Sequence, residues 1–151
     1  MTLDELDRIF RAYDGVRVLE AQDDLFYLYD PAADLPPERQ QPFATIVTGD
    51  HYETVSRLAE PGTFRLNLGL TKSTYVSLFG DPPTERDADW VLDSGHDYAA
   101  RDTLMPHPFY ASQYWVAIVD PTGPDRLHPL MDEAYDFARR KYSNHRTRQT
   151  G

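Results

Sequence analysis

The chain has 151 residues, 40% of them hydrophobic, which suits a single domain with one core. It contains no cysteine, so disulfide scaffolds, thiolate metal sites and cysteine nucleophiles are excluded. No apolar run approaches the roughly 18 residues that a membrane span requires, and residues 1–13 form an acidic amphipathic segment rather than a secretion signal. We therefore expect a cytoplasmic protein with no membrane partner.

The net charge of −10 is distributed unevenly along the chain. Residues 1–138 hold all 25 acidic side chains and 10 of the 15 basic ones, a net charge of −15, whereas residues 139–151 carry +5. An acidic body repels the phosphate backbone that supplies most nonspecific nucleic-acid affinity, so nucleic acid is disfavoured as a partner. We expect residues 1–142 to form one domain and residues 143–151 to be a disordered, basic tail.

The first third of the chain carries clear local signals. Thr2 and Glu5 have the spacing of a capping box, and apolar residues then recur at helical spacing until Gly15. Residues 16–21 and 25–29 are rich in β-formers and flank a polar turn, which predicts a hairpin. Along the second of these strands apolar side chains point to both faces, so a homodimer that covers the second face is a further expectation.

The middle of the chain continues the sheet. A strand is predicted over residues 43–48, and residues 52–58 fit either a short strand or an irregular edge. In the strand from Phe64 to Leu68, apolar residues alternate with Arg65 and Asn67. These two polar residues share the face opposite the core. They are either an ordinary solvated pair or two donors that line a groove.

A short helix, an unclear segment, a strand and a long helix complete the pattern. Thr71 caps the short helix, and residues 85–101 are either a lid-like excursion or one edge strand. Residues 114–119 form the clearest strand, and an amphipathic helix begins near His128, with Pro129 in its first turn. This order predicts an α+β fold with one antiparallel sheet and helices packed on one face.

The least generic stretch surrounds His107. This histidine stands between two prolines, which stiffen the backbone on both sides of it, and Tyr110, Tyr114 and Trp115 follow closely. His107 is either a half-buried histidine bonded to backbone or a general acid/base oriented by Asp102 or Tyr110. The candidate catalytic residues are therefore His107, Asp102 and Tyr110. The candidate ligand-binding residues are Arg65, Asn67, Tyr114 and Trp115.

The closing third of the chain resembles the MmcQ/YjbR-like family. The resemblance lies in the polar and aromatic stretch from Met105, the strand that begins near Trp115 and the helix carrying Leu130, Ala134 and Tyr135. Residues 42–48 and 64–69 also resemble an uncharacterised actinobacterial family of unknown function that shares this plan. The resemblance implies a YjbR-like, frataxin-like two-layer fold. Basic residues that precede the tryptophan in YjbR-like proteins, a group regarded as DNA-binding, are largely absent here.

No phosphate loop, nucleotide-binding glycine motif, nucleophile elbow or paired-histidine metal motif occurs in the sequence. We therefore expect no cofactor and no metal. Three functions remain as hypotheses. The first is a binding or interaction module with an aromatic, polar-lined groove for a small molecule or a protein, the second is a cofactor-independent enzyme that uses His107, and the third is a YjbR-like nucleic-acid binder.

Overall fold

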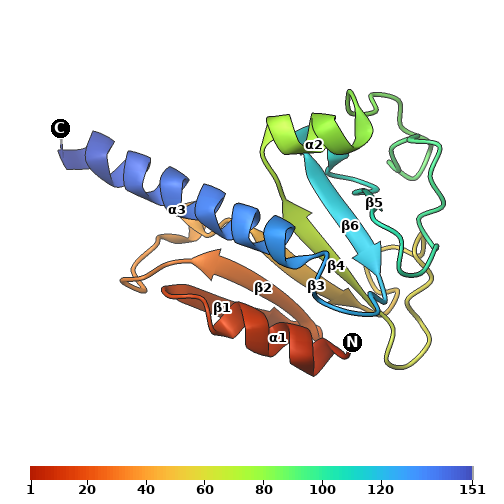
Figure 1. Ribbon diagram of the computed structural model, residues 1–151, viewed down its shortest axis with the longest axis horizontal. Coiled ribbons are helices and arrows are strands. Elements are labelled where there is room, and N and C mark those ends of the chain that lie inside the picture. The colour runs from red at the N-terminus through yellow and green to blue at the C-terminus, as the bar shows by residue number, and fades with distance from the viewer. Residues whose placement is uncertain (151) are drawn as a thin grey trace.

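The sheet is antiparallel throughout and is accompanied by three helices (Figure 1). The computed structural model describes residues 1–150, and the strand order is β1-β2-β3-β4-β6-β5. The predicted α+β class, with one antiparallel sheet, is confirmed. The helices are α1 (Leu3–Arg11), α2 (Lys72–Phe79) and α3 (His128–Thr150), and the strands are β1 (Val16–Ala21), β2 (Asp24–Tyr29), β3 (Ala44–Thr48), β4 (Phe64–Gly69), β5 (Met105–Pro106) and β6 (Trp115–Val119).

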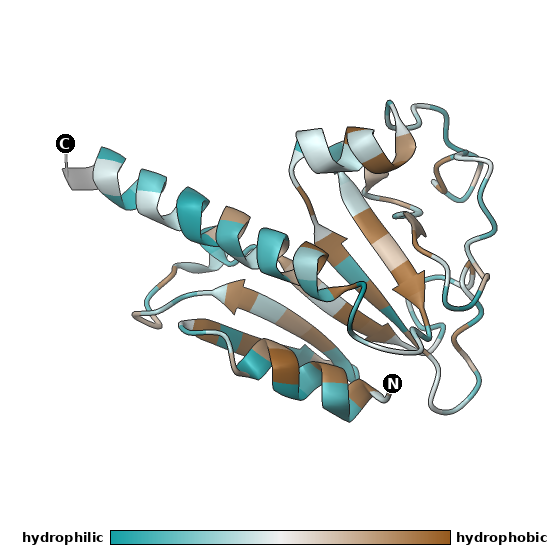
Figure 2. Ribbon diagram, in the orientation of Figure 1, coloured by the Kyte–Doolittle hydropathy of each residue, from teal (hydrophilic) through white to brown (hydrophobic). Residues whose placement is uncertain are grey.

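The helices share one apolar core with one face of the sheet, which we call the helix face. Leu6 and Phe10 of α1, Tyr75 of α2 and Met131 of α3 belong to the same buried cluster as Leu66 of β4. Figure 1 shows α1 and α3 lying across the strands on the same side. Figure 2 shows that the strands are largely hydrophobic, whereas the outer part of α3 is hydrophilic. The helices therefore pack on one face, as the sequence predicts.

The opposite face, which we call the groove face, is covered in part by two irregular segments, residues 49–63 and 81–104. Both segments contribute to a second, smaller apolar cluster that lies against β5 and β6. The members of this cluster are Leu58, Tyr98, Met105, Ala117 and Val119. The segments leave the part of the groove face that carries Arg65 and Asn67 next to a cavity.

Local sequence signals set several boundaries as predicted. Thr2 and Glu5 form the capping box of α1, and the Thr71 hydroxyl accepts a hydrogen bond from the Thr74 N–H at the start of α2. Gln22 and Asp23, with φ of 53° and 69°, form the tight turn between β1 and β2. The helix, hairpin and cap predictions are confirmed.

Three segments either decide between predicted alternatives or differ from the prediction. Residues 52–58 and 85–101 form no strand, apart from isolated bridges between Arg86 and Leu92 and between Arg101 and Val119. The two-residue strand β5 was not predicted, because its second residue is a proline, which argues against a strand. The proline is tolerated here because β5 lies at the sheet edge, where the missing N–H removes no ladder bond.

The tail predicted to be disordered is instead the end of α3, which continues to Thr150. Two contacts hold the C-terminal part of α3 against the body of the domain. The Tyr142 ring packs edge-on against Tyr29 with centroids 5.2 Å apart, and Arg146 donates to Asp34 at 2.7 Å. The prediction for Gly151 lies outside the described residues. Within residues 1–150, no helix has the length and apolarity needed to cross a bilayer.

Candidate functional site

A polar network forms the floor of the groove face. The alternation of β4 directs Arg65 and Asn67 away from the helices, and both are nonetheless buried, with exposures of 3% and 1%. Arg65 Nε donates to Asn67 Oδ1 at 3.0 Å, and Asn67 Nδ2 donates to Thr45 Oγ1 at 2.9 Å. Thr45 stands opposite Asn67 in the β3–β4 register. The two predicted donors thus lie side by side beneath a groove.

The irregular segment between β3 and β4 completes the coordination of Arg65. Its Nη1 donates to Glu53 Oε1 and to Ser56 Oγ, each at 2.9 Å. Burial lowers the pKa of Arg65, and the Glu53 carboxylate acts in the opposite direction. A guanidinium remains protonated in proteins, so the floor carries one fixed, buried positive charge paired with a carboxylate.

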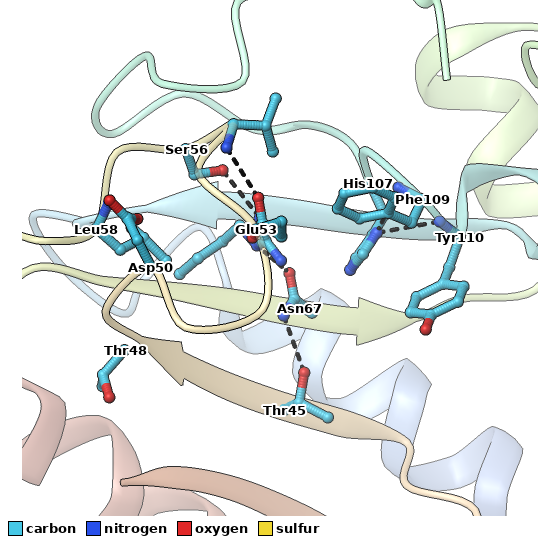
Figure 3. Close-up of polar contacts among 12 residues, drawn as sticks. Thr45, Thr48, Asp50, Glu53, Ser56, Leu58, Asn67, His107, Phe109 and Tyr110 are labelled. Carbon is cyan, nitrogen blue, oxygen red and sulfur yellow. Dashed lines mark hydrogen bonds and ion pairs between the residues drawn. The ribbon is translucent and has the colours of Figure 1, made fainter. Parts of the chain in front are cut away.

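Residues 49–63 are held firmly enough to serve as a wall of the site. The buried Asp24 carboxylate accepts from the Thr48 N–H at 2.7 Å and lies 3.0 Å from His51 Nε2. Asp50 accepts from the Leu58 N–H at 2.8 Å, so the beginning of the segment is tied to β2 and its middle is closed by a bond of its own (Figure 3). These contacts position Glu53 and Ser56 over β4.

His107 is buried, with 2% exposure, and its protonation state follows from its contacts. Nδ1 accepts hydrogen bonds from the Phe109 and Tyr110 backbone N–H groups at 3.0 and 3.1 Å (Figure 3). A nitrogen that accepts two N–H donors carries no proton, so the proton of the neutral ring is on Nε2. Burial, reinforced by the Arg65 charge, holds the pKa of His107 well below its usual value.

Trp115 forms an aromatic wall next to His107. The two rings are 6.3 Å apart at their centroids, and a Cβ added to Gly69 would lie 2.9 Å from Trp115 Cε2. Only a glycine at 69 lets the indole lie this close to β4. The Tyr110 ring, 52% exposed, lies 4.8 Å from the His107 ring and forms part of the cavity mouth.

Two predicted site residues lie elsewhere. Tyr114 packs against Tyr75 on the helix side, with ring centroids 5.8 Å apart, and does not line the cavity. Asp102 accepts from the Thr122 N–H at 2.9 Å and also bonds Arg126. The Thr122 N–H is the main cause of the lowered pKa of Asp102. His107 is therefore oriented by the two backbone amides rather than by Asp102, and its role in catalysis remains a prediction.

A cavity of about 970 Å³ opens above the floor. It extends past the strand ends, by way of residues 35–43, to α3. Within residues 1–150, Arg65 Nη2, His107 Nε2 and Trp115 Nε1 have no hydrogen-bond partner. In the same residues, the one fully buried polar side-chain atom without a partner is the Tyr75 hydroxyl, so these three donors reach open space.

The sequence analysis missed Thr45, Glu53 and Ser56, and also Phe26 and Tyr52, which line the cavity. For Thr45 the alternation of β3 carries a signal, because Thr45 and Val47 face away from the core residue Ile46. For Glu53 and Ser56 no periodicity exists, since their positions depend on an irregular segment. No group of three or more metal-ligating side chains occurs among the described residues.

Of three comparisons with known proteins, one assigns the chain to a family. No curated protein and no solved structure matches it. The resemblance to the MmcQ/YjbR-like family therefore gains no support from these comparisons and stays a prediction. One family model matches residues 1–148, nearly the whole chain, under the description "Family of unknown function (DUF6194)". The chain belongs to this family.

Proposed function

We propose that the protein is a binding module that takes up a small molecule in the cavity on the groove face. The observation that carries the proposal is the pairing of two side chains, Arg65 and His107, that are buried yet keep free N–H groups directed into open space. The bonds on their other nitrogens fix these two side chains in position, and the free N–H groups face the cavity. A ligand acceptor placed there takes the place of water and gains hydrogen bonds whose geometry is already set.

The lining has the composition of a ligand pocket. Phe26, Val47 and Trp115 supply apolar surface, while a few polar groups converge on the floor. Pockets for small molecules have this character, with volumes of about 300–1,000 Å³. The hydrogen-bonded floor and the tied wall segment also mean that the site is formed before a ligand arrives, which lowers the entropic cost of binding.

Two-dimensional NMR with a library of small aromatic fragments tests the proposal. The chain has two tryptophans, and their indole N–H signals report on different places. Trp115 lines the cavity, whereas Trp90 is 71% exposed and does not line it. We expect fragments to shift the Trp115 signal and the Tyr110 amide while the Trp90 signal stays still.

Two variants test whether the fragments bind in the cavity. One fills the cavity, and the other is its matched control. Val47→Phe adds bulk beside Arg65 without removing a side-chain hydrogen bond, and it should weaken fragment binding by about tenfold or more. Leu78→Phe adds the same ring to an exposed position of α2 and should leave binding unchanged. Fragments that never shift Trp115, or that bind Val47→Phe as well as the unchanged protein, would rule out the cavity as the binding site.

A further inference from the structure

The hydrogen-bonding groups of the floor are used unequally. Its acceptors are occupied within the chain: Asn67 Oδ1 by Arg65, Thr45 Oγ1 by Asn67, and His107 Nδ1 by two backbone amides. Glu53 is occupied on both oxygens, since Oε1 accepts from Arg65 and Oε2 accepts from the Val55 N–H. The ligand therefore meets few free acceptors on this floor.

Hydrogen-bond donors of Arg65, His107 and Trp115 are not used within the described part of the chain. Arg65 Nη2 has two N–H groups, and His107 Nε2 and Trp115 Nε1 have one each, with no partner within residues 1–150. The His107 bonds fix this arrangement, because two amides on Nδ1 force the proton onto Nε2. A group that only accepts hydrogen bonds satisfies this floor, and an ammonium or other pure donor does not.

The charge of the cavity lining also favours a ligand that accepts hydrogen bonds. On the floor Arg65 is paired with Glu53, and toward α3 the cavity is lined by Arg39 and Lys141 with Glu38, so the lining as a whole carries one more positive than negative charge in a chain whose net charge is −10. The Glu53 carboxylate is already paired with Arg65 and with a backbone amide. An anionic group near Arg65 Nη2 gains charge-assisted hydrogen bonds from the two N–H groups of this nitrogen, which the chain leaves free.

We propose that the ligand carries a carboxylate on an aromatic or apolar body, with the carboxylate between Arg65 Nη2 and His107 Nε2 and the body against Trp115 and Phe26. This assignment rests on the proposed function and adds the chemical class of its ligand. The indole of Trp115 packs close to Gly69 and lines the cavity, and Phe26, which also lines it, is in register with Thr45 on the same face of the sheet.

Three probes of one shape separate the contributions of charge and hydrogen bonding. They are 2-naphthoate, its neutral amide 2-naphthamide, and the cationic 2-(aminomethyl)naphthalene, each titrated into the full chain while the Trp115 indole signal is followed. We expect naphthoate to bind about tenfold or more tightly than the amine, with the amide in between. In the Arg65→Gln/Glu53→Gln variant, which removes both charges of the pair, the preference for naphthoate over the amide should disappear.

The outcomes distinguish this inference from the proposed function. An amine that binds as tightly as naphthoate, or an amide that binds equally well, would overturn the carboxylate assignment and leave the cavity a binding site. If neither these probes nor any fragment moves the Trp115 signal, both proposals fall. Because the ranking is measured first on the unchanged protein, it stands even if the double variant does not fold.

Discussion

The two faces of the sheet are stabilised in different ways. On the helix face, Ile46, Leu66 and Ile118 are fully or almost fully buried and belong to the main apolar cluster. On the groove face, the residues next to them in sequence or across the ladder include Thr45, Arg65 and Asn67, which are joined by hydrogen bonds. The helix face is stabilised by apolar burial, whereas the groove face combines a hydrogen-bonded polar network with the smaller apolar cluster.

This difference explains why the site is on the groove face. A close-packed apolar face leaves no space and no specific contacts for a ligand. A polar floor fixes its side chains through directed bonds, and it can leave particular donors free, as at Arg65 and His107. The second face is closed by loops rather than helices, and these loops leave a cavity.

Leu66→Ala tests the helix face and should have the largest effect. Leu66 is fully buried at the centre of the sheet, so its truncation leaves a cavity among Ile46, Ile118 and the helices. We expect the free energy of unfolding to fall by about 3–4 kcal/mol. Urea denaturation followed by circular dichroism measures it. A loss well below this range would mean that the helices collapse onto the vacated space.

Arg65→Met tests the groove face at the adjacent position of the same strand. Methionine keeps the apolar stem and removes the charge, which leaves the Glu53 carboxylate, 16% exposed, without its cation. The expected loss is about 2–3 kcal/mol, below the usual cost of breaking a fully buried pair because Glu53 keeps some contact with water.

The partner substitution shows whether pairing is the cause. In Arg65→Met/Glu53→Gln no carboxylate is left unpaired, so the double variant should be more stable than Arg65→Met by about 1 kcal/mol or more. The same denaturation experiment measures all three variants. If the Glu53 substitution instead adds to the loss, the pairing explanation is wrong and Arg65 acts through packing of its stem.

The difference between the faces was visible in part from the sequence. The alternation from Phe64 to Leu68 predicts that Arg65 and Asn67 share the face away from the core, and the register confirms it. Their burial was not predictable, because Glu53 and Ser56 come from a segment without periodicity. Leu28, which suggested a homodimer, is fully buried within the chain; the dimer stays a prediction that light scattering would test.

His107 shows what short-range pattern can and cannot supply. The flanking prolines and nearby aromatic residues predict a stiff segment beside an aromatic surface; the Tyr110 and Trp115 rings do lie next to His107, and the cavity adjoins them. Proximity along the chain favoured Asp102 as the orienting group, but its side chain bonds Thr122 and Arg126 instead. The bonds that orient the ring come from backbone N–H groups, which every residue except proline possesses, so no residue type signals them.

The neutral state of His107 gives the groove face a pH dependence below pH 6.5. Its pKa in the folded protein lies well below the value of 6.5 that holds in the unfolded chain. The unfolded state therefore binds more protons below pH 6.5, and stability present above that pH is lost as the pH falls. The loss approaches about 1.4 kcal/mol per pH unit below pH 6.5 and ends once the pH falls below the pKa of His107 in the folded protein.

His107→Asn isolates this contribution. The Asn Oδ1 can accept from the amides two and three residues later, as in an Asx turn, but it does not titrate. The free energy of unfolding is measured against pH for both proteins, and the slope below pH 6.5 should be shallower in the variant. Equal slopes would mean that His107 has the same affinity for protons in the folded and unfolded states, so that burial and the two amide bonds do not lower its pKa.

The smallest effect is expected where the groove face is most tightly packed. In Gly69→Ala the new Cβ would meet Trp115 Cε2 at 2.9 Å and Nε1 at 3.1 Å, so the indole must move away from β4. We expect a loss of about 1–2 kcal/mol in the free energy of unfolding, and a shifted Trp115 indole signal with the Trp90 signal unchanged. Gly123→Ala, where the added Cβ meets nothing within 4 Å, is the control. Because the indole is one wall of the cavity, a displaced Trp115 should also weaken fragment binding, whereas unchanged binding would show that the ring surface over Gly69 is not part of the site.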